Sequence, residues 1–240
     1  MRTHAAAQLI GSRSHQCDAT ATYAHNGVRA YALLDGIGSS DEIRDWTRTK
    51  ARSLARAAAR LADAEAGLTH VYDQAAAEPE RNNLFAELPS AVAVVAVTHP
   101  ASSLLTVAWC GDSRAYLLVD GKLERLTVDH NMRQVLLDQG VIPGPYARNR
   151  VTSWLGNTAL VPEPGEQPLI GSTVRPLGGR LLLASDGAYE PLEDSCFDLT
   201  QLLDSTPAKA ARGFTLAAIE RAPLRADNAT VLIADLPDNQ

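Results

Sequence analysis

The sequence has little cysteine, few aromatic residues and no long hydrophobic run. Its three cysteines, Cys17, Cys110 and Cys196, stand far apart in 240 residues. This spacing excludes a disulfide framework and a CxxC zinc site and favours a reducing compartment, so we expect a cytoplasmic protein. The most apolar stretch, 91–97, is far shorter than the ~20 residues that span a bilayer. Residues 1–10 show no signal-peptide pattern, and we expect no membrane association.

Positive charge is also scarce. The chain has 22 Lys and Arg against 28 Asp and Glu, a formal net charge of −6, which disfavours general binding to nucleic acids. Aromatic residues make up 5% of the chain, and its tryptophans are dispersed, so no base-stacking platform is indicated. Hydrophobic residues make up 45%, which is globular composition and suffices for one sizeable core. We expect a single domain over residues 1–240, and a monomer.

Apolar runs separated by short turns predict a β-rich domain. Because short turns join consecutive strands, antiparallel pairing is expected, in an α+β domain with sheets at the centre and helices outside. Gly67 is the expected break in the long first helix, and Asp120-Gly121 predicts a hairpin. Strands are expected at 28–34, 90–98, 104–110, 115–119, 122–126, 180–184 and 228–234, and helices at 43–77, 132–139 and 207–221.

Aspartates stand at the ends of several predicted strands. A lone Asp in a turn is usually a solvated turn residue. If the strands are neighbours, however, their carboxylates converge, and like charges at such distances require cations. Carboxylate oxygens suit hard ions such as Mg²⁺ and Mn²⁺. The aspartates concerned are Asp18, Asp35, Asp112, Asp186 and Asp227.

Two further residues extend this metal-site hypothesis. Gly36 follows Asp35 and lacks a Cβ, so its backbone carbonyl can approach a metal closely. Arg13 lies five residues before Asp18, and its guanidinium could bind phosphate by its bidentate fork; an exposed surface charge is an equally good interpretation of this arginine. Two hard ions in such a site commonly hydrolyse phosphoesters through a metal-activated water.

Six short motifs occur in a fixed order over residues 11–235. Together they resemble the motifs of the type 2C metal-dependent Ser/Thr protein phosphatases, the PPM family, in their compact bacterial form. Each is weak alone, but six in this order are specific. The motifs are Arg13 to Asp18, Asp35-Gly36-Ile37-Gly38 (DGxG), Gly111 to Leu117 (GDSRxYL), Leu126 to His130 (LTxDH), Ser185-Asp186-Gly187 (SDG) and Asp227 to Val231 (DNxTV).

The resemblance implies a fold and an activity. The fold would be a four-layer αββα sandwich, in which two mostly antiparallel sheets are flanked by helix pairs, within one catalytic domain. A variable flap beside the cleft would fall at 141–155. The activity would be hydrolysis of phosphoserine and phosphothreonine in bacterial signalling, with no phosphoenzyme intermediate. The partners would be phosphorylated proteins, with a Ser/Thr kinase as one candidate.

The resemblance also assigns roles to the candidate residues. Asp35 would bridge two Mn²⁺ or Mg²⁺ ions, with Asp186 and Asp227 completing the first. The Gly36 carbonyl would contact the second ion, together with water and Asp18. Asp112 and Asp186 would hold a third, looser ion. Arg13 would bind the substrate phosphate.

Two departures from the family pattern leave an alternative open. Cys17 stands where the family usually has Glu or Gln, and a neutral thiol is a poor ligand for a hard ion. Ile37 stands where some members carry a histidine, so water would protonate the leaving group. The alternative is a catalytically weak or inactive phosphatase-like module that binds a regulatory partner.

Motifs of other enzyme classes fail in context. A dinucleotide-binding interpretation of Gly36-Ile37-Gly38 would place its third glycine at Asp41, where an acid repels pyrophosphate. Gly111 to Ala115 nearly spells the serine-hydrolase elbow, but the next residues are expected to form a strand, not a helix. His130 is better explained as a turn or cap residue than as a base.

Overall fold

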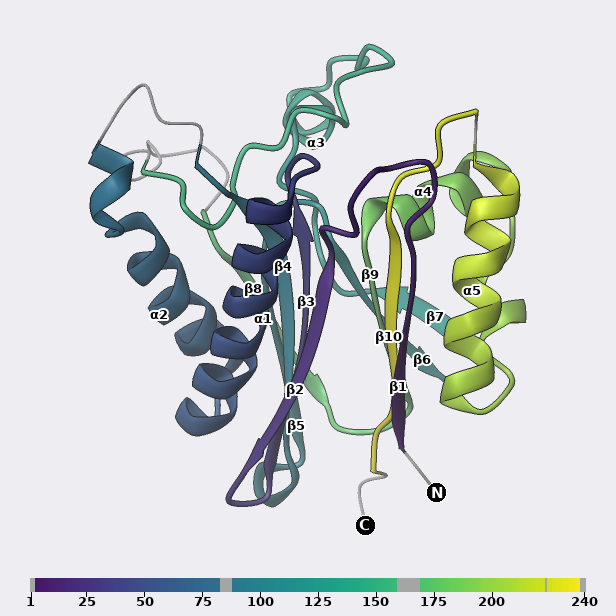
Figure 1. Ribbon diagram of the computed structural model, residues 1–240. Helices are drawn as coiled ribbons and strands as arrows, with labels where there is room; N and C mark the ends of the chain where they lie inside the picture. Colours follow the sequence, from purple (N-terminus) through teal and green to yellow (C-terminus); the bar gives the residue numbers. More distant parts are fainter. Residues whose placement is uncertain (1–2, 83–87, 159–168, 223, 238–240) are drawn as a thin grey trace.

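Two five-stranded antiparallel sheets form the centre of the molecule, a computed structural model that describes residues 3–82, 88–158, 169–222 and 224–237 (Figure 1). The first sheet has the strand order β1-β10-β9-β6-β7, and the second has the order β2-β3-β4-β5-β8. The first comprises β1 (His4–Leu9), β10 (Ala229–Asp235), β9 (Arg180–Ala184), β6 (Arg114–Val119) and β7 (Lys122–Arg125). The second comprises β2 (Ala19–His25), β3 (Val28–Gly36), β4 (Ala91–His99), β5 (Leu104–Cys110) and β8 (Gly171–Pro176).

Helices cover the outer face of each sheet. Figure 1 shows α1 (Asp41–Leu61) and α2 (Ala64–Ala76) on the second sheet, and α5 (Pro207–Arg221) with α4 (Asp186–Asp194) on the first. The short α3 (Met132–Asp138) stands apart, beyond one end of the sheets. Three 3₁₀ turns, Pro79–Asn82, Pro100–Ser102 and Leu199–Leu202, occur between these elements. The predicted αββα order of layers is confirmed.

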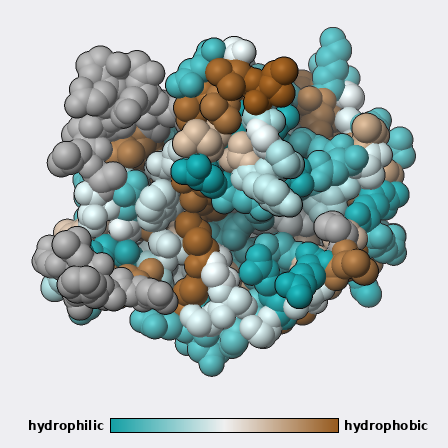
Figure 2. All heavy atoms as spheres, turned by 90° about the horizontal axis from the view of Figure 1, so that it is seen from above, coloured by the Kyte–Doolittle hydropathy of each residue, from teal (hydrophilic) through white to brown (hydrophobic). Residues whose placement is uncertain are grey.

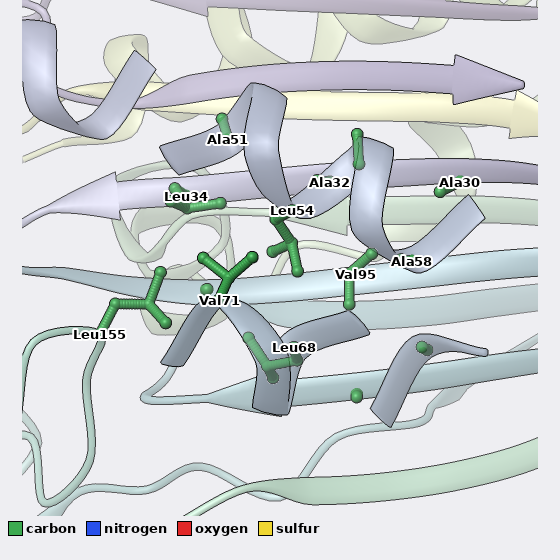
Figure 3. Close-up of a cluster of buried hydrophobic side chains, with 14 of the residues drawn as sticks. Ala30, Ala32, Leu34, Ala51, Leu54, Ala58, Leu68, Val71, Val95 and Leu155 are labelled. Atoms are coloured by element: carbon green, nitrogen blue, oxygen red, sulfur yellow. The ribbon is translucent and has the colours of Figure 1, made fainter. Parts of the chain in front are cut away.

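Three apolar clusters hold the layers together. Leu33, Val94 and Leu183 belong to the cluster between the two sheets. A second cluster, between the second sheet and α1 and α2, is rich in alanine and includes Leu54 and Leu68 (Figure 3). The small alanine side chains let these helices lie close to the sheet, and the buried leucines fill the remaining space. A third cluster lies between the first sheet and helices α4 and α5, which pack on it.

The first helix pair breaks at Ala62, so the prediction of a break at Gly67 is wrong. Ala62 has φ 56°, in the left-handed region, and its N–H donates to the carbonyl of Ala58. Asp63 then caps α2 by accepting a hydrogen bond from the Ala66 N–H at 2.8 Å. Gly67 lies inside α2 against α1, where a Cβ would come within 2.4 Å of the Ala58 Cα. Its role is close helix packing.

Most predicted strands and helices are confirmed to within a residue or two, but four elements were not predicted. These elements are β1, β2, β8 and α4. Asp120 and Gly121 have φ of 49° and 76°, which confirms the tight hairpin between β6 and β7. Residues after Gly111 enter β6 rather than a helix, so the serine-hydrolase elbow is excluded. No helix in the described ranges is both long and apolar enough to cross a membrane.

Candidate metal centre

The sheet registers bring five aspartates to one end of the molecule. Asp18 precedes β2, whose Ala19 pairs with Leu34, so Asp18 lies beside Asp35 near the end of β3. In the other sheet, Ala184 pairs with both Arg114 and Val231. This register places the loops that carry Asp112, Asp186 and Asp227 next to one another.

These loops surround a cavity of about 210 Å³. Asp18 does not line it but lies buried behind Asp35, with 2% of its surface exposed. Among the residues predicted for the site, those that line the cavity are Arg13, Asp35, Gly36, Asp112, Asp186 and Asp227. The structure thus brings these six residues together from both sheets around one cavity, with Asp18 outside it.

The carboxyl groups of the cluster contact one another. Asp35 lies within hydrogen-bonding contact of both Asp186 and Asp18. Backbone N–H groups hold two other carboxylates, since Gly187 donates to Asp186 Oδ1 at 2.5 Å and Asn228 donates to Asp227 Oδ1 at 2.7 Å. The strand ends therefore fix these side chains in place without neutralising their charge.

Burial raises the pKa of four of these carboxyls, and their mutual repulsion adds to the effect. The pKa of Asp18 rises to about 7, chiefly because the group is buried, and Asp186 adds to the rise. The pKa of Asp35 rises well above its usual value through burial and the charges of Asp18 and Asp186. Burial likewise raises the pKa of Asp112 and of Asp186. Full ionisation of this cluster requires nearby positive charge.

Arg13 supplies one such charge. Its Nη2 donates to Asp227 Oδ2 at 2.5 Å, and 45% of the side chain is exposed. The hydrogen bond to Asp227 raises the pKa of Arg13, so the guanidinium stays charged. An exposed, charged guanidinium at the mouth of the cavity has donors free to meet an incoming anion.

Gly36 is required by packing as well as by its place in the cavity. A Cβ on Gly36 would lie 2.7 Å from the Cys17 carbonyl oxygen and 2.8 Å from Thr47 Oγ1. The Cys17 thiol is buried, and its Sγ donates to the Ser40 carbonyl at 3.7 Å. Cys17 therefore packs against the start of α1 and does not line the cavity.

The donor set fits hard divalent ions. It offers carboxylate oxygens and a backbone carbonyl, which Mg²⁺ and Mn²⁺ prefer. Asp18 Oδ2 is buried and has no hydrogen-bond partner within ordinary distance among the described residues, and such an orphaned oxygen is suited to a cation or its water. Across those same residues, no three His, Cys, Asp or Glu side chains are already grouped around one point. In their present arrangement the carboxyls contact each other and Arg13.

Sequence reasoning missed two charged residues of the cavity, Arg148 and Glu190. Burial raises the pKa of Glu190 to about 7, and Asp186 one helical turn earlier adds to the rise. Arg148 donates to both oxygens of Asp194 at 2.8 Å and lies 3.3 Å from Glu190 Oε2. Glu190 could have been found from its spacing, four residues after Asp186, had α4 been predicted. Arg148 falls within residues 141–155, which the family resemblance places beside the cleft, but no motif distinguishes it from the other residues of that segment.

A buried ionic network supports the centre from behind. Arg114 donates to both oxygens of Asp129 at 2.8 and 2.7 Å and to Glu193 at 2.8 Å. Its guanidinium also lies 3.8 Å from the ring centroid of Tyr189. The Tyr189 hydroxyl donates to the Asp112 backbone carbonyl at 3.0 Å. The motifs GDSRxYL and LTxDH therefore meet in one network that ends at a cavity aspartate.

Comparisons with known proteins agree with this arrangement. The sequence model of the family "Protein phosphatase 2C" matches residues 8–135, more than half of the chain. The serine/threonine protein phosphatase PstP of Mycobacterium tuberculosis is 34% identical over 138 residues, which are 58% of this chain and 26% of that protein. The chain thus spans about a quarter of the length of this curated relative.

Solved structures show the same fold over the whole chain. A bacterial serine phosphatase aligns with a TM-score of 0.80 at 21% identity and covers 100% of both chains. The catalytic domain of PstP, solved in complex with two manganese ions, aligns with a TM-score of 0.69 at 24% identity and covers 98% of both chains. The αββα architecture extends well beyond the part that the family model matches.

Proposed function

Because the chain belongs to the protein phosphatase 2C family, we propose that it is a metal-dependent protein serine/threonine phosphatase with Mn²⁺ or Mg²⁺ as its cofactor. The observation that carries the proposal is the convergence of Asp35, Asp186 and Asp227 with Arg13 on one cavity. Acidic oxygens that bind divalent ions, next to a cation that binds phosphate, are what phosphomonoester hydrolysis requires.

Each side chain has a task in this reaction. Metal ions held here would supply a water of lowered pKa and would neutralise charge on the phosphate. The residues that would hold them are Asp35, Gly36, Asp186 and Asp227, with Asp18 and Asp112 at the margins. Arg13 turns from Asp227 toward the substrate phosphate and orients it for in-line attack. Ile37, which lines the cavity, has no proton to give, so the leaving alkoxide takes its proton from solvent.

The test is hydrolysis of a phosphothreonine peptide with Mn²⁺. Phosphate release is expected for the phosphothreonine and phosphoserine forms, to be abolished by EDTA, and to be negligible for the phosphotyrosine form. Arg13→Ala should lower kcat/KM by about 10²-fold, the value of one or two charge-assisted hydrogen bonds. Asp120→Asn changes an exposed acid on the far hairpin and should keep wild-type activity. No release at any Mn²⁺ concentration would overturn the proposal.

Cys17 supports a second candidate, a catalytically weak or inactive phosphatase-like module that binds a regulatory partner. A buried thiol stands where the family usually has an acidic or amide side chain; it contacts the Ser40 carbonyl and does not line the cavity. Retained binding of a phosphothreonine peptide without hydrolysis would favour the module. Phosphorylated proteins are the partners that we propose for the enzyme. A monomer in the cytoplasm is the expected form, and we propose residues 1–240 as one catalytic domain.

A further inference from the structure

The segment 132–151 differs from the rest of the chain in both charge and hydropathy. It carries three arginines and one aspartate, whereas the whole chain has a net charge of −6. It also exposes four large apolar side chains, which we call the flap surface: Leu137 (42% exposed), Val141 (47%), Ile142 (92%) and Tyr146 (78%). None of the residues of α3 is buried. Figure 2, which looks onto this end of the molecule, shows hydrophobic surface gathered there beside hydrophilic surface.

The flap surface is held at a fixed place beside the candidate metal centre. At its base, Met132 N–H donates to the Arg150 carbonyl at 2.8 Å, and Arg133 N–H donates to the Ala147 carbonyl at 3.1 Å. Arg148 ties the same segment to α4 through Asp194. Arg148, Asn149 and Val151 then line the cavity itself. The segment that carries the flap surface therefore also forms part of the cavity wall.

The segment is also preorganised. Pro143 and Pro145 restrict the backbone between Val141 and Tyr146. Val141 N–H donates to the Leu136 carbonyl at 2.8 Å, which closes the turn after α3. A stiff loop loses little conformational entropy when a partner covers it, so more of its contact energy appears as affinity.

We propose that the flap surface binds apolar side chains that flank the phosphorylated residue of a protein substrate. The proposal rests on the proposed function and narrows the substrate class to phosphorylated segments with aliphatic or aromatic neighbours. Positive charge at the cavity mouth and in segment 132–151 complements the phosphate. The uncharged flap surface selects for apolar neighbours, because burying each of these side chains removes apolar area from water.

The test compares two peptides that differ only beside the phosphorylated residue. Both carry a non-hydrolysable phosphonate analogue of phosphothreonine and have the same length and charge. One has leucine and phenylalanine as neighbours, and the other has serine and glutamine. Binding is measured by fluorescence anisotropy with Mn²⁺ present, so the result does not depend on turnover. The wild type should bind the apolar peptide about tenfold more tightly, as expected for partial burial of two side chains.

Variants assign this preference to the flap surface. Ile142→Ser with Tyr146→Ser should abolish the preference and leave the affinity for the polar peptide unchanged. Leu61→Ser removes an apolar side chain that is 52% exposed at the far end of α1, about 30 Å along that helix from its start, and should keep the preference. The kcat/KM for p-nitrophenyl phosphate should stay within about twofold in all variants, because that substrate is too small to reach the flap surface.

Two results would overturn the proposal. One is equal affinity of the wild type for both peptides, or a preference that survives the double substitution. The other is a wild-type dimer that Ile142→Ser with Tyr146→Ser converts to a monomer in light scattering, which would make the flap surface an interface between copies. Failure of the proposed function looks different, because selective peptide binding would then persist without any hydrolysis of p-nitrophenyl phosphate.

Discussion

Arg114 is the residue on which the arrangement behind the metal centre depends. Its side chain is 6% exposed and pairs with Asp129, which is 5% exposed. Arg114→Met should lower the free energy of unfolding by about 3–5 kcal/mol, because it removes the guanidinium that donates to both oxygens of the buried Asp129 carboxylate. Urea denaturation measures the loss. Arg114→Lys keeps the charge but not the bidentate geometry, so its free energy of unfolding should lie between those of the wild type and Arg114→Met. Equal stability of the wild type and Arg114→Met would contradict this account.

His130 should make stability depend on pH. It is buried beside Trp109, and burial lowers its pKa to about 4, against about 6.5 in an unfolded chain. The folded state thus disfavours the protonated form. The contribution of neutral His130 to the free energy of unfolding is fully present above about pH 6.5 and is lost as the pH falls toward 4. Between pH 7 and pH 5 the free energy of unfolding should fall by about 2 kcal/mol.

Comparison with a variant isolates the histidine. His130→Gln cannot titrate, so its free energy of unfolding should fall less steeply over the same range. Carboxyls titrate in both proteins, so the difference between the two slopes is the measured quantity. Parallel slopes would show that His130 does not titrate differently in the two states.

At the scale of elements, two glycines in helices should respond in opposite directions to the same substitution. Gly67→Ala places a methyl group against the α1 backbone and should destabilise the protein by about 1–3 kcal/mol despite the better helix propensity of alanine. A methyl group at Gly213 in α5 would meet no neighbouring element within 4 Å. Gly213→Ala should therefore stabilise by about 0.5–1 kcal/mol. Thermal unfolding of the two variants checks the direction of each change in stability. A Gly67→Ala protein as stable as the wild type would contradict the close packing of α1 on α2.

Some helices and strands can be predicted from the sequence alone, and others cannot. Buried strands such as β4 and β5 are predictable because continuous β-branched and apolar runs form them regardless of their neighbours. Strand β1 was missed because its alanine-rich sequence is stabilised by pairing with β10, more than 200 residues away. Helix α4 was missed because it begins at a turn-like Ser-Asp-Gly and contains Pro191; burial of Tyr189 and Leu192 stabilises it instead. Tertiary contacts decide both elements.

In the candidate site too, some residues are predictable from local sequence and others are placed by tertiary contacts. The aspartates at strand ends are predictable, because strand and turn signals place each carboxylate and the sheet register then brings them together. Arg148 and Glu190 are not, since their position in the cavity depends on how segment 132–151 and α4 pack on each other. Helical spacing alone would have placed Glu190 beside Asp186, but only after α4 itself was known.

At the scale of the whole molecule, the cluster of aspartates that would bind metal ions also lowers the stability of the metal-free protein. Buried like charges destabilise the metal-free protein, and cations that bind only the folded state stabilise it. Mn²⁺ at about 100 times its dissociation constant should add about 2.7 kcal/mol. For a chain of this size that corresponds to a rise in Tm of about 5–10 °C. EDTA should reverse the rise, which differential scanning calorimetry measures.

Asp35→Asn should raise the stability of the metal-free protein and reduce its stabilisation by Mn²⁺. It removes one buried negative charge, so without metal its Tm should lie above that of the wild type, whereas most of the Mn²⁺-induced rise should disappear. Asp120→Asn alters an exposed acid on the hairpin between β6 and β7 and should match the wild type in both conditions. An Asp35→Asn protein that is less stable than the wild type without metal, and still gains the full increment from Mn²⁺, would show that Asp35 neither repels its neighbours nor binds the ion.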